Sequence, residues 1–213
     1  MIPTPSHIKK IVAGGKSLTQ ARKVLIMLHG RGATAESILT FASHLKTDDF
    51  ALLAPQATNN TWYPYSFLAA PAENEPWLSS ALSWLSEMVS DLIAQGFTKE
   101  NIYFFGFSQG ASLTLEFVTR NASRYGGITA FTGGLIGDRI YPENYSGDFD
   151  GTPIVLGTSD PDQHVPVTRV RTSAKILESM HASVTVNTYA FMGHTINQDE
   201  IDTANRLVFS PGI

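Results

Sequence analysis

The sequence predicts a single-domain α/β protein with a mostly parallel sheet and helices on both faces. Two observations lead to this prediction. The chain has 213 residues, of which 43% are hydrophobic and 16% charged, a composition typical of one globular domain with a sizeable core. Short apolar segments alternate along the chain with longer amphipathic segments, and such alternation is typical of parallel strands connected by helices.

Six segments are predicted to be buried strands. Each contains several β-branched or aromatic residues and ends at glycine, proline or a polar turn, as strands covered on both faces do. In chain order they are KVLIMLHG (23–30), FALLAPQ (50–56), NIYFFGFS (101–108), GGITAFTGG (126–134), TPIVLGTSD (152–160) and VTVNTYAF (184–191). A further edge strand and its turn are predicted within residues 1–20, at HIKKIVAGGK.

Five segments are predicted to be helices. In chain order they are TAESILTFASHL (34–45), NEPWLSSALSWLSEMVSDLIAQG (74–96), QGASLTLEFVTRNASRY (109–125), VTRVRTSAKILESM (167–180) and DEIDTANRLVF (199–209). In the second, apolar residues recur every three or four positions and predict one buried stripe. The predicted stripe consists of Leu78, Leu82, Leu85, Val89 and Ile93.

The composition argues against several classes of function. The net charge is −4, with 15 Lys and Arg against 19 Asp and Glu, so there is no basic surplus to neutralise nucleic-acid phosphates. Cysteine is absent, and no paired histidine motif for a metal occurs. The N-terminus has no apolar signal-peptide core, and no apolar stretch is long enough to span a membrane. We therefore expect a cytoplasmic protein without a metal, a nucleic-acid partner or stable membrane insertion.

The motif GFSQG (106–110) lies where a predicted strand becomes a predicted helix. This context is that of a nucleophile elbow, in which a sharp turn exposes a serine at the carboxyl end of a strand. Gly106 and Gly110 keep side chains out of the space where the strand and the helix approach each other. A serine hydroxyl is a weak nucleophile and needs a base that is itself held by a third group. Ser108 is therefore the candidate nucleophile.

Candidates for the base and the acid follow two later predicted strands. His194 comes after the strand 184–191, and its neighbour Gly193 places it in a loop. TSDPDQHVP (158–166) follows the strand 152–160 and contains both Asp160 and Asp162. A carboxylate beside the histidine would fix its tautomer and stabilise the imidazolium that forms during catalysis. We favour Asp162, because its spacing from Val165 and Pro166 ties it to the start of the next helix, and we expect Asp160 to bind nearby loop amides.

An oxyanion hole is also required, normally built from two backbone N–H groups. One donor comes from the residue after the nucleophile, which is Gln109. The other comes from an earlier loop between a strand and a helix, and HGRGA (29–33) fits this position because its glycines allow close backbone approach. We assign the two donors to the amides of Arg31 and Gln109.

Together, HGRGA, GFSQG, DQHVP and FMGHTI resemble the phospholipase/carboxylesterase family of α/β-hydrolases, which includes bacterial carboxylesterases and acyl-protein thioesterases. The resemblance extends from about Lys23 to Leu207. It implies hydrolysis of carboxylic esters or thioesters without a metal or organic cofactor. It also implies that Ser108 is the nucleophile, His194 the base and Asp162 the acid. Arg31 departs from the hydrophobic residue usual in members near the acyl-protein thioesterases, which argues against a long-chain lipid substrate.

Substrate specificity is expected to depend on the long segment 57–77, ATNNTWYPYSFLAAPAENEPW. Segments of this length without regular structure are often lids or binding walls. We expect Trp62, Tyr63 and Phe67 to line an acyl pocket, although aromatic residues also anchor irregular loops by packing. The segment 135–151 is too short and too polar for a large cap domain, so an open site is expected.

The remaining histidines are assigned other roles. His29 precedes the oxyanion glycines and is expected to make a structural hydrogen bond, while His164 either lines the site or packs beside it. His7, His44 and His181 are interpreted as surface or helix-end residues. None of them occurs at a spacing typical of metal ligands.

The sequence therefore predicts a serine carboxylesterase that cleaves small or medium acyl esters through an acyl-enzyme on Ser108. An acyl-protein thioesterase or lysophospholipase would use the same machinery with a different pocket. A noncatalytic binding module is a third alternative. We expect the chain, residues 1–213, to act on a small-molecule acyl ester as a monomer or a homodimer.

Overall fold

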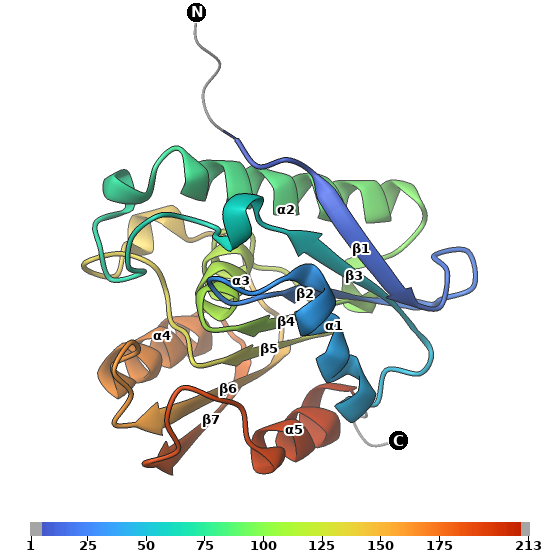
Figure 1. Cartoon of the computed structure of the whole chain (residues 1–213). Coiled ribbons are helices and arrows are strands. Elements are labelled where there is room, and N and C mark those ends of the chain that lie inside the picture. The colour runs from blue at the N-terminus through green and yellow to red at the C-terminus, as the bar shows by residue number, and fades with distance from the viewer. Residues whose placement is uncertain (1–5, 210–213) are drawn as a thin grey trace, which may run out of the picture.

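A seven-stranded sheet forms the centre of the protein (Figure 1). The computed structural model describes residues 6–209. The strands are β1 (Lys10–Gly15), β2 (Lys23–Leu28), β3 (Phe50–Gln56), β4 (Ile102–Phe107), β5 (Gly127–Phe131), β6 (Pro153–Asp160) and β7 (Ser183–Ala190). Their order across the sheet is β1-β3-β2-β4-β5-β6-β7. β1 is antiparallel to β3, and every other neighbouring pair is parallel.

This sheet confirms the mostly parallel arrangement that the sequence predicts. All six predicted strands are present, and β1 is the predicted edge strand. The prediction that β7 is buried on both faces was wrong, because β7 is the outermost strand of the sheet and its residues are half-buried or exposed. Residues 1–5 of the predicted edge segment lie outside the described residues. The five parallel strands between β1 and β7 are nearly completely buried, because helices cover both faces of the sheet.

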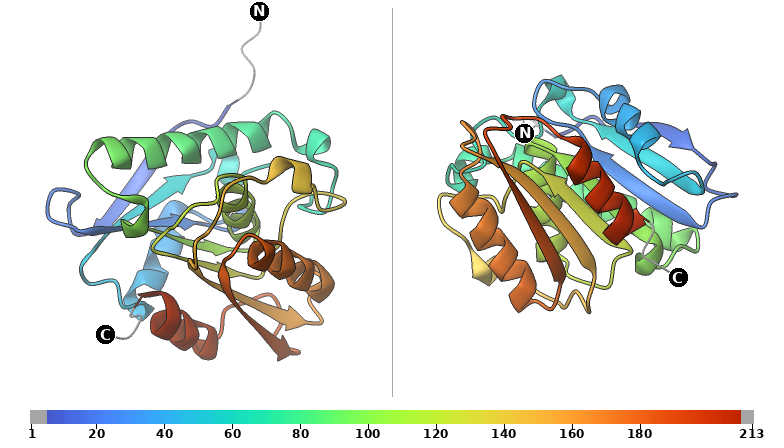
Figure 2. Two further views of the ribbon diagram at one scale, coloured as in Figure 1. Left: turned by 180° about the vertical axis from the view of Figure 1, so that it is seen from behind. Right: turned by 90° about the horizontal axis from the view of Figure 1, so that it is seen from below.

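The helices form two layers around the sheet (Figure 2). They are α1 (Ala35–Leu39), α2 (Trp77–Ala94), α3 (Gln109–Arg120), α4 (Val167–Ser179) and α5 (Gln198–Ala204). α2, α3 and α4 pack on one face, and α1 and α5 pack on the other. Each predicted helical segment coincides with one of them, and α5 begins one residue before its predicted segment.

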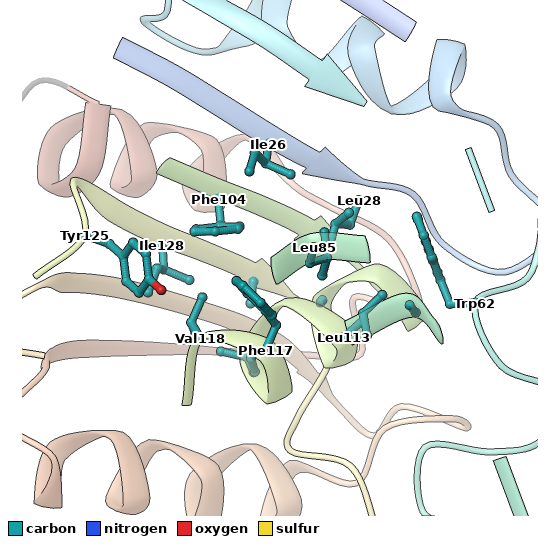
Figure 3. Close-up of a cluster of buried hydrophobic side chains, with 14 of the residues drawn as sticks. Ile26, Leu28, Trp62, Leu85, Phe104, Leu113, Phe117, Val118, Tyr125 and Ile128 are labelled. Carbon is teal, nitrogen blue, oxygen red and sulfur yellow. The ribbon is translucent and has the colours of Figure 1, made fainter. Parts of the chain in front are cut away.

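The larger hydrophobic core lies between the sheet and the layer of α2 and α3. Figure 3 shows side chains of β2, β4 and β5, among them Ile26, Phe104 and Ile128, facing Phe117 of α3. Phe104 and Phe117 have ring centroids 5.8 Å apart. Close packing of this kind holds α3 firmly against the sheet, and the first turn of α3 follows Ser108 directly.

The buried stripe of α2 differs from the prediction at two residues. Leu78, Leu85 and Val89 are buried as expected, whereas Leu82 is only partly buried. Ile93, however, is 44% exposed, while its neighbour Leu92 is buried at 2%. The prediction for Ile93 was wrong because the buried stripe is centred nearer Trp84 and Met88 than the leucine spacing alone indicates. Ile93 lies one residue further around the helix than Leu92, and its side chain therefore points toward solvent.

His7 is also buried, contrary to the interpretation that it is a surface residue. Its ring lies against three tryptophans, with centroids 5.6 Å from Trp62, 5.1 Å from Trp77 and 6.3 Å from Trp84. Nδ1 accepts a hydrogen bond from the Thr58 amide at 3.1 Å, so Nε2 carries the proton and donates to the Trp62 carbonyl at 3.0 Å. His44 and His181 are exposed, as expected.

We expect His7→Phe to destabilise the protein mainly at neutral pH. The variant leaves the Thr58 amide and the Trp62 carbonyl unpaired, which should cost about 2 kcal/mol and lower the midpoint of thermal unfolding by about 4–8 °C. Burial lowers the pKa of His7, although the bond to Trp62 opposes this. The native state therefore disfavours the proton, and the stability from His7 is present above the ordinary pKa and is lost as pH falls below it.

Thermal melts of both proteins between pH 5 and 8 test this expectation. The difference between wild type and His7→Phe should shrink toward acid pH. A difference that stays constant over this range would show that His7 is not held neutral in the native state.

The carboxyl ends of the parallel strands lie at one edge of the sheet. All five predicted functional loops begin there, after β2, β3, β4, β6 and β7. Ligands of such sheets bind at this edge. Among residues 6–209, no helix has both the length and the apolar character needed to cross a membrane.

Candidate active site

Ser108 occupies the sharp turn between β4 and α3. Its backbone has φ 55° and ψ −119°, a conformation that residues with a side chain rarely adopt. The Ser108 amide donates to the Phe131 carbonyl of β5 at 2.9 Å, and the Ser108 carbonyl accepts from Ser112 in the first turn of α3. The sheet and the helix together hold the strained turn in place.

The two glycines of GFSQG lie where neighbouring backbone atoms leave no room for a side chain. A Cβ atom on Gly106 would lie 2.5 Å from the Gly110 carbonyl oxygen. A Cβ atom on Gly110 would lie 2.1 Å from the carbonyl oxygen of Leu28, at the end of β2. Any larger residue at these positions would push α3 away from the sheet, so the Gly-x-Ser-x-Gly spacing follows from the close approach of strand and helix.

Ser108, His194 and Asp162 form a continuous hydrogen-bonded chain. Ser108 Oγ lies 2.8 Å from His194 Nε2, and His194 Nδ1 lies 2.9 Å from Asp162 Oδ2. An ionised carboxylate only accepts hydrogen bonds, so His194 Nδ1 carries the proton of a neutral ring. His194 Nε2 is then free to accept the proton of the Ser108 hydroxyl.

Asp162 is held in a fixed direction. Its Oδ1 accepts hydrogen bonds from the amides of His164 at 2.7 Å and Val165 at 2.9 Å, which leaves Oδ2 for His194. The Asp162 side chain is 0% exposed. Burial by itself would raise the pKa of Asp162, but the hydrogen bonds from the two amides and from His194 hold this pKa below its ordinary value. The carboxylate therefore stays ionised beside His194.

Asp160, the alternative acid, lies outside this chain of hydrogen bonds. β6 continues through Asp160, whose partner in β7 is Ala190, and the residue is exposed. Within residues 6–209 its carboxylate makes no hydrogen bond, so the expectation that it binds nearby loop amides was wrong. The polar contact at this residue is made by its backbone carbonyl, which accepts from the Phe191 amide at 3.2 Å.

Two aromatic rings lie close to the His194 ring. Its centroid lies 5.4 Å from that of Phe107 and 5.1 Å from that of His164. Ser159 connects the loop of the histidine to that of the acid, because its Oγ accepts from the Gly193 amide at 3.0 Å and donates to the Pro161 carbonyl. No local sequence pattern marks Ser159.

The oxyanion loop approaches Ser108 closely. A Cβ atom on Gly30 would lie 3.3 Å from Ser108 Cβ. Among the described residues, the backbone amides of Arg31 and Gln109 have no protein acceptor. For Gln109 the reason is general, because the first N–H groups of a helix have no intrahelical partner. Both amides belong to residues that line the same cleft as Ser108.

The His29 ring connects the oxyanion loop to the segment after β3. Its Nε2 accepts from the Ala57 amide at 3.1 Å, and its Nδ1 donates to the Gly30 carbonyl at 2.8 Å. The residue is completely buried. These contacts confirm the structural role expected of His29.

A cleft of about 620 Å³ opens beside Ser108 and His194. Its lining includes residues 63–68, which belong to what we call the wall segment (residues 61–68). Tyr63 and Phe67 belong to this part of the lining, and Gln163, His164 and Val165 also line the cleft. Asp162 is hidden behind His194, and the lining of the cleft contains no aspartate or glutamate.

Trp62 does not line the cleft, in contrast to Tyr63 and Phe67. It is 0% exposed, and its indole Nε1 donates to the His29 carbonyl at 2.9 Å. Its ring packs against His7, His29 and Trp84. Burial of the large Trp62 ring against the core is more favourable than its exposure in an open cleft. Trp62 therefore anchors the wall segment to the core.

Sequence reasoning missed Ser112, which also lines the cleft. It lies one helical turn after Ser108 on α3, and its Oγ accepts from the Gly134 amide at 3.3 Å. The spacing of four residues on a predicted helix could have identified it, because such residues share a face.

A model of the phospholipase/carboxylesterase family matches residues 8–208. The chain belongs to this family. A crystal structure of a family member, the phospholipase/carboxylesterase from Dyadobacter fermentans DSM 18053, superposes with a TM-score of 0.95 at 51% identity, covering 96% of this chain and 98% of that one.

Curated relatives of the family carry two kinds of name. A probable carboxylesterase SOBER1-like protein of Arabidopsis thaliana is 24% identical over 200 residues, covering 86% of this chain and 76% of its own. Acyl-protein thioesterase 1 of Gibberella zeae is 24% identical over 210 residues, covering 86% and 88%. The family confirms the predicted α/β-hydrolase fold and the prediction that the chain is a carboxylic ester hydrolase.

Proposed function

We propose that the protein hydrolyses small or medium acyl esters through an acyl-enzyme on Ser108. The observation that carries this proposal is the chain of hydrogen bonds from Ser108 Oγ to His194 Nε2 and from His194 Nδ1 to Asp162 Oδ2, at 2.8 Å and 2.9 Å. In this proposal His194 is the general base, Asp162 orients it, and the amides of Arg31 and Gln109 form the oxyanion hole.

Acylation follows from these positions. His194 Nε2 removes the Ser108 hydroxyl proton while Oγ attacks the ester carbonyl carbon, and the two amides bind the oxygen that becomes negative. Asp162 stabilises the imidazolium that results. When the tetrahedral intermediate collapses, the bond to the alcohol oxygen breaks and His194 gives its proton to the departing alcohol.

Deacylation repeats the sequence with water. His194 takes a proton from a water molecule, which attacks the acyl carbon, and the same amides bind the new oxyanion. The bond to Ser108 Oγ then breaks, and His194 returns a proton to Oγ. The products are the carboxylic acid and the regenerated serine, and no step needs a metal or an organic cofactor.

A noncatalytic binding module is the main alternative from another class. One relative, from Oryza sativa subsp. japonica, is named a probable inactive carboxylesterase, so loss of activity has been assigned within this family. A fluorophosphonate probe separates the two possibilities, because it reacts only with an activated serine. We expect rapid covalent labelling of one serine, identified as Ser108 by peptide mass spectrometry, and an unlabelled native protein would contradict the proposed function.

A thioesterase would use the same machinery, and several relatives are named acyl-protein thioesterase 1. The open cleft and its short apolar wall favour small or medium oxyesters. Values of kcat/KM for matched oxyesters and thioesters with acyl chains from acetyl to palmitoyl separate these substrates. A maximum at palmitoyl thioester would favour the thioesterase.

Phe67→Ala is expected to change the preferred acyl chain length. Phe67 lines the cleft, so its removal lengthens the space next to the acyl chain. The ratio of kcat/KM for octanoyl to butyryl ester should rise about tenfold, since one to a few methylene groups in an apolar pocket change selectivity by this amount. Labelling by the fluorophosphonate should persist, because Phe67 takes no part in the hydrogen bonds that join Ser108, His194 and Asp162.

Phe41→Ala serves as the matched control. Phe41 is a half-buried phenylalanine on the other face of the sheet, where it packs against Phe105. Phe41→Ala should lower the stability of the protein without changing the ratio of kcat/KM for octanoyl to butyryl ester. An equal change in both variants would show that Phe67 acts through general stability and not through the acyl pocket.

A further inference from the structure

Both terminal nitrogens of the Arg31 guanidinium bind the wall segment. Nη1 donates to Thr61 Oγ1 at 3.0 Å and to the Pro64 carbonyl at 2.9 Å. Nη2 donates to the carbonyls of Tyr63 and Tyr65. All four N–H bonds of the two terminal nitrogens are therefore used, and of the five donors of a guanidinium only Nε–H remains.

This arrangement argues against a direct role of Arg31 in holding an anionic substrate. A carboxylate is bound best by two parallel N–H groups of the guanidinium, and these already bind carbonyl oxygens. Within residues 6–209, no carboxylate forms an ion pair with Arg31. The positive charge of Arg31 is therefore not neutralised, but the donors of its two terminal nitrogens already bind protein oxygens.

The Gln109 side chain also binds this part of the wall segment. Its Oε1 accepts from the Trp62 amide at 2.8 Å, and its Nε2 donates to the Tyr63 carbonyl at 2.8 Å. The Tyr63 carbonyl thus receives hydrogen bonds from the side chains of both Arg31 and Gln109. These are the two residues to whose backbone amides the oxyanion hole is assigned.

The backbone of the oxyanion loop is connected to the same region. The Gly32 amide donates to the Asn60 carbonyl at 2.7 Å, directly before the wall segment. Gly32 has φ +76°, and with Gly30 it leaves the loop little intrinsic rigidity. Contacts outside the loop must therefore hold the Arg31 amide in its place near Ser108.

We infer that the Arg31 side chain is a positioning residue that fastens the oxyanion loop to the wall segment, so that the oxyanion amide and the acyl wall form one rigid unit. This inference rests on the proposed function, because it assigns the oxyanion amide to Arg31. The side chain acts through that amide and through the wall and does not touch the substrate. Removal of the side chain should loosen both the oxyanion loop and the wall segment. The value of kcat should therefore fall even for a substrate too short to reach the wall segment.

The decisive comparison is Arg31→Met against the matched control Arg139→Met. Methionine keeps the backbone amide and much of the side-chain length but removes all donors. Arg139 is an exposed arginine away from the cleft, where it binds Glu143 and the Ile140 carbonyl. On an acetyl ester, kcat of Arg31→Met should fall about 10- to 100-fold, because a displaced oxyanion donor loses much of its effect. The KM for this ester should change less than kcat, and Arg139→Met should resemble wild type in both.

Two further measurements separate positioning from direct anion binding. The first compares a neutral acyl ester with one of equal length that ends in a carboxylate, and Arg31→Met should lose the same factor in kcat on both. The second adds guanidinium chloride at millimolar concentration to Arg31→Ala, where the small cation can enter the vacated space and restore part of kcat. Arg139→Ala with the same additive should not change.

Arg31→Lys covers the case in which the methionine variant does not fold. Lysine keeps the charge but cannot reproduce the planar fork that reaches three carbonyls. It should melt near the wild-type temperature and still show a reduced kcat on the acetyl ester. Circular dichroism and thermal melts establish folding in each variant.

Three results would overturn the inference: wild-type kcat on the acetyl ester in a folded Arg31→Met or Arg31→Lys, a loss confined to the carboxylate-bearing ester, or a loss confined to esters long enough to reach the wall. Fluorophosphonate labelling keeps these results apart from failure of the proposed function. If the proposed function fails, the wild-type protein is not labelled. If only the inference fails, wild type and Arg31→Met are labelled at the same rate.

Discussion

Replacing Ser108 with alanine is expected to lower ester turnover by about 10⁴- to 10⁶-fold and to abolish fluorophosphonate labelling. The variant removes the Oγ atom that forms the acyl-enzyme, and His194 then has no nucleophile to activate. The residues of such a site act as a unit, so the loss should be close to that caused by removing several of them. Residual turnover would come from the oxyanion amides and substrate binding alone.

The experiment measures kcat/KM on a butyryl ester and labelling by gel fluorescence. Ser83→Ala is the matched control, because Ser83 is an exposed serine on α2. The control should retain wild-type turnover and labelling. If Ser108→Ala kept most of its turnover, another residue would have to be the nucleophile, and the proposed function would be wrong.

Replacing Asp162 with asparagine is expected to cost about 10⁴ in turnover, although the side chain keeps its size. The physical reason is the tautomer of His194. If the oxygen of the new carboxamide accepts from the amides that now bind Asp162 Oδ1, its NH₂ group faces His194 Nδ1 and requires that nitrogen to accept. His194 Nε2 then carries the proton and cannot accept the proton of Ser108.

Asp160→Asn is the matched control for this prediction. Asp160 is exposed at the end of β6, and its carboxylate makes no hydrogen bond within residues 6–209. Its replacement should change turnover by less than about threefold, as surface substitutions usually have small effects. A large loss in Asp160→Asn with a small loss in Asp162→Asn would assign the acid to the other residue.

Local sequence patterns were sufficient to predict the fold and the central part of the candidate site. Apolar segments of strand length alternate with amphipathic segments, and these periods depend only on backbone geometry. The GFSQG motif marks a turn that only glycine neighbours allow. His194 and Asp162 could be predicted because the carboxyl ends of parallel strands meet at one edge, which brings loops distant in the sequence together.

The tertiary structure alone decided how the irregular segments, which lack the periodicity of a helix or a strand, are packed. Trp62 and Tyr63 are neighbours in one irregular segment and both are buried, yet Tyr63 borders the cleft and Trp62 does not. His7 is buried because three tryptophans from the wall segment and α2 surround it. Nothing in the residues next to either position indicates these partners, which for His7 lie far away along the chain.

Arg31 illustrates the same limit within the site. The sequence places its backbone amide in the oxyanion loop, because the position of that amide follows from the HGRGA motif and the strand before it. The direction of its guanidinium depends on where the carbonyls of residues 63–65 come to lie, and this is set by the packing of Trp62 and the hydrogen bonds of Gln109. Sequence determines the elements and the residues at their ends, whereas long-range packing determines which side chains meet, because contact free energies depend on the folded arrangement of the whole chain.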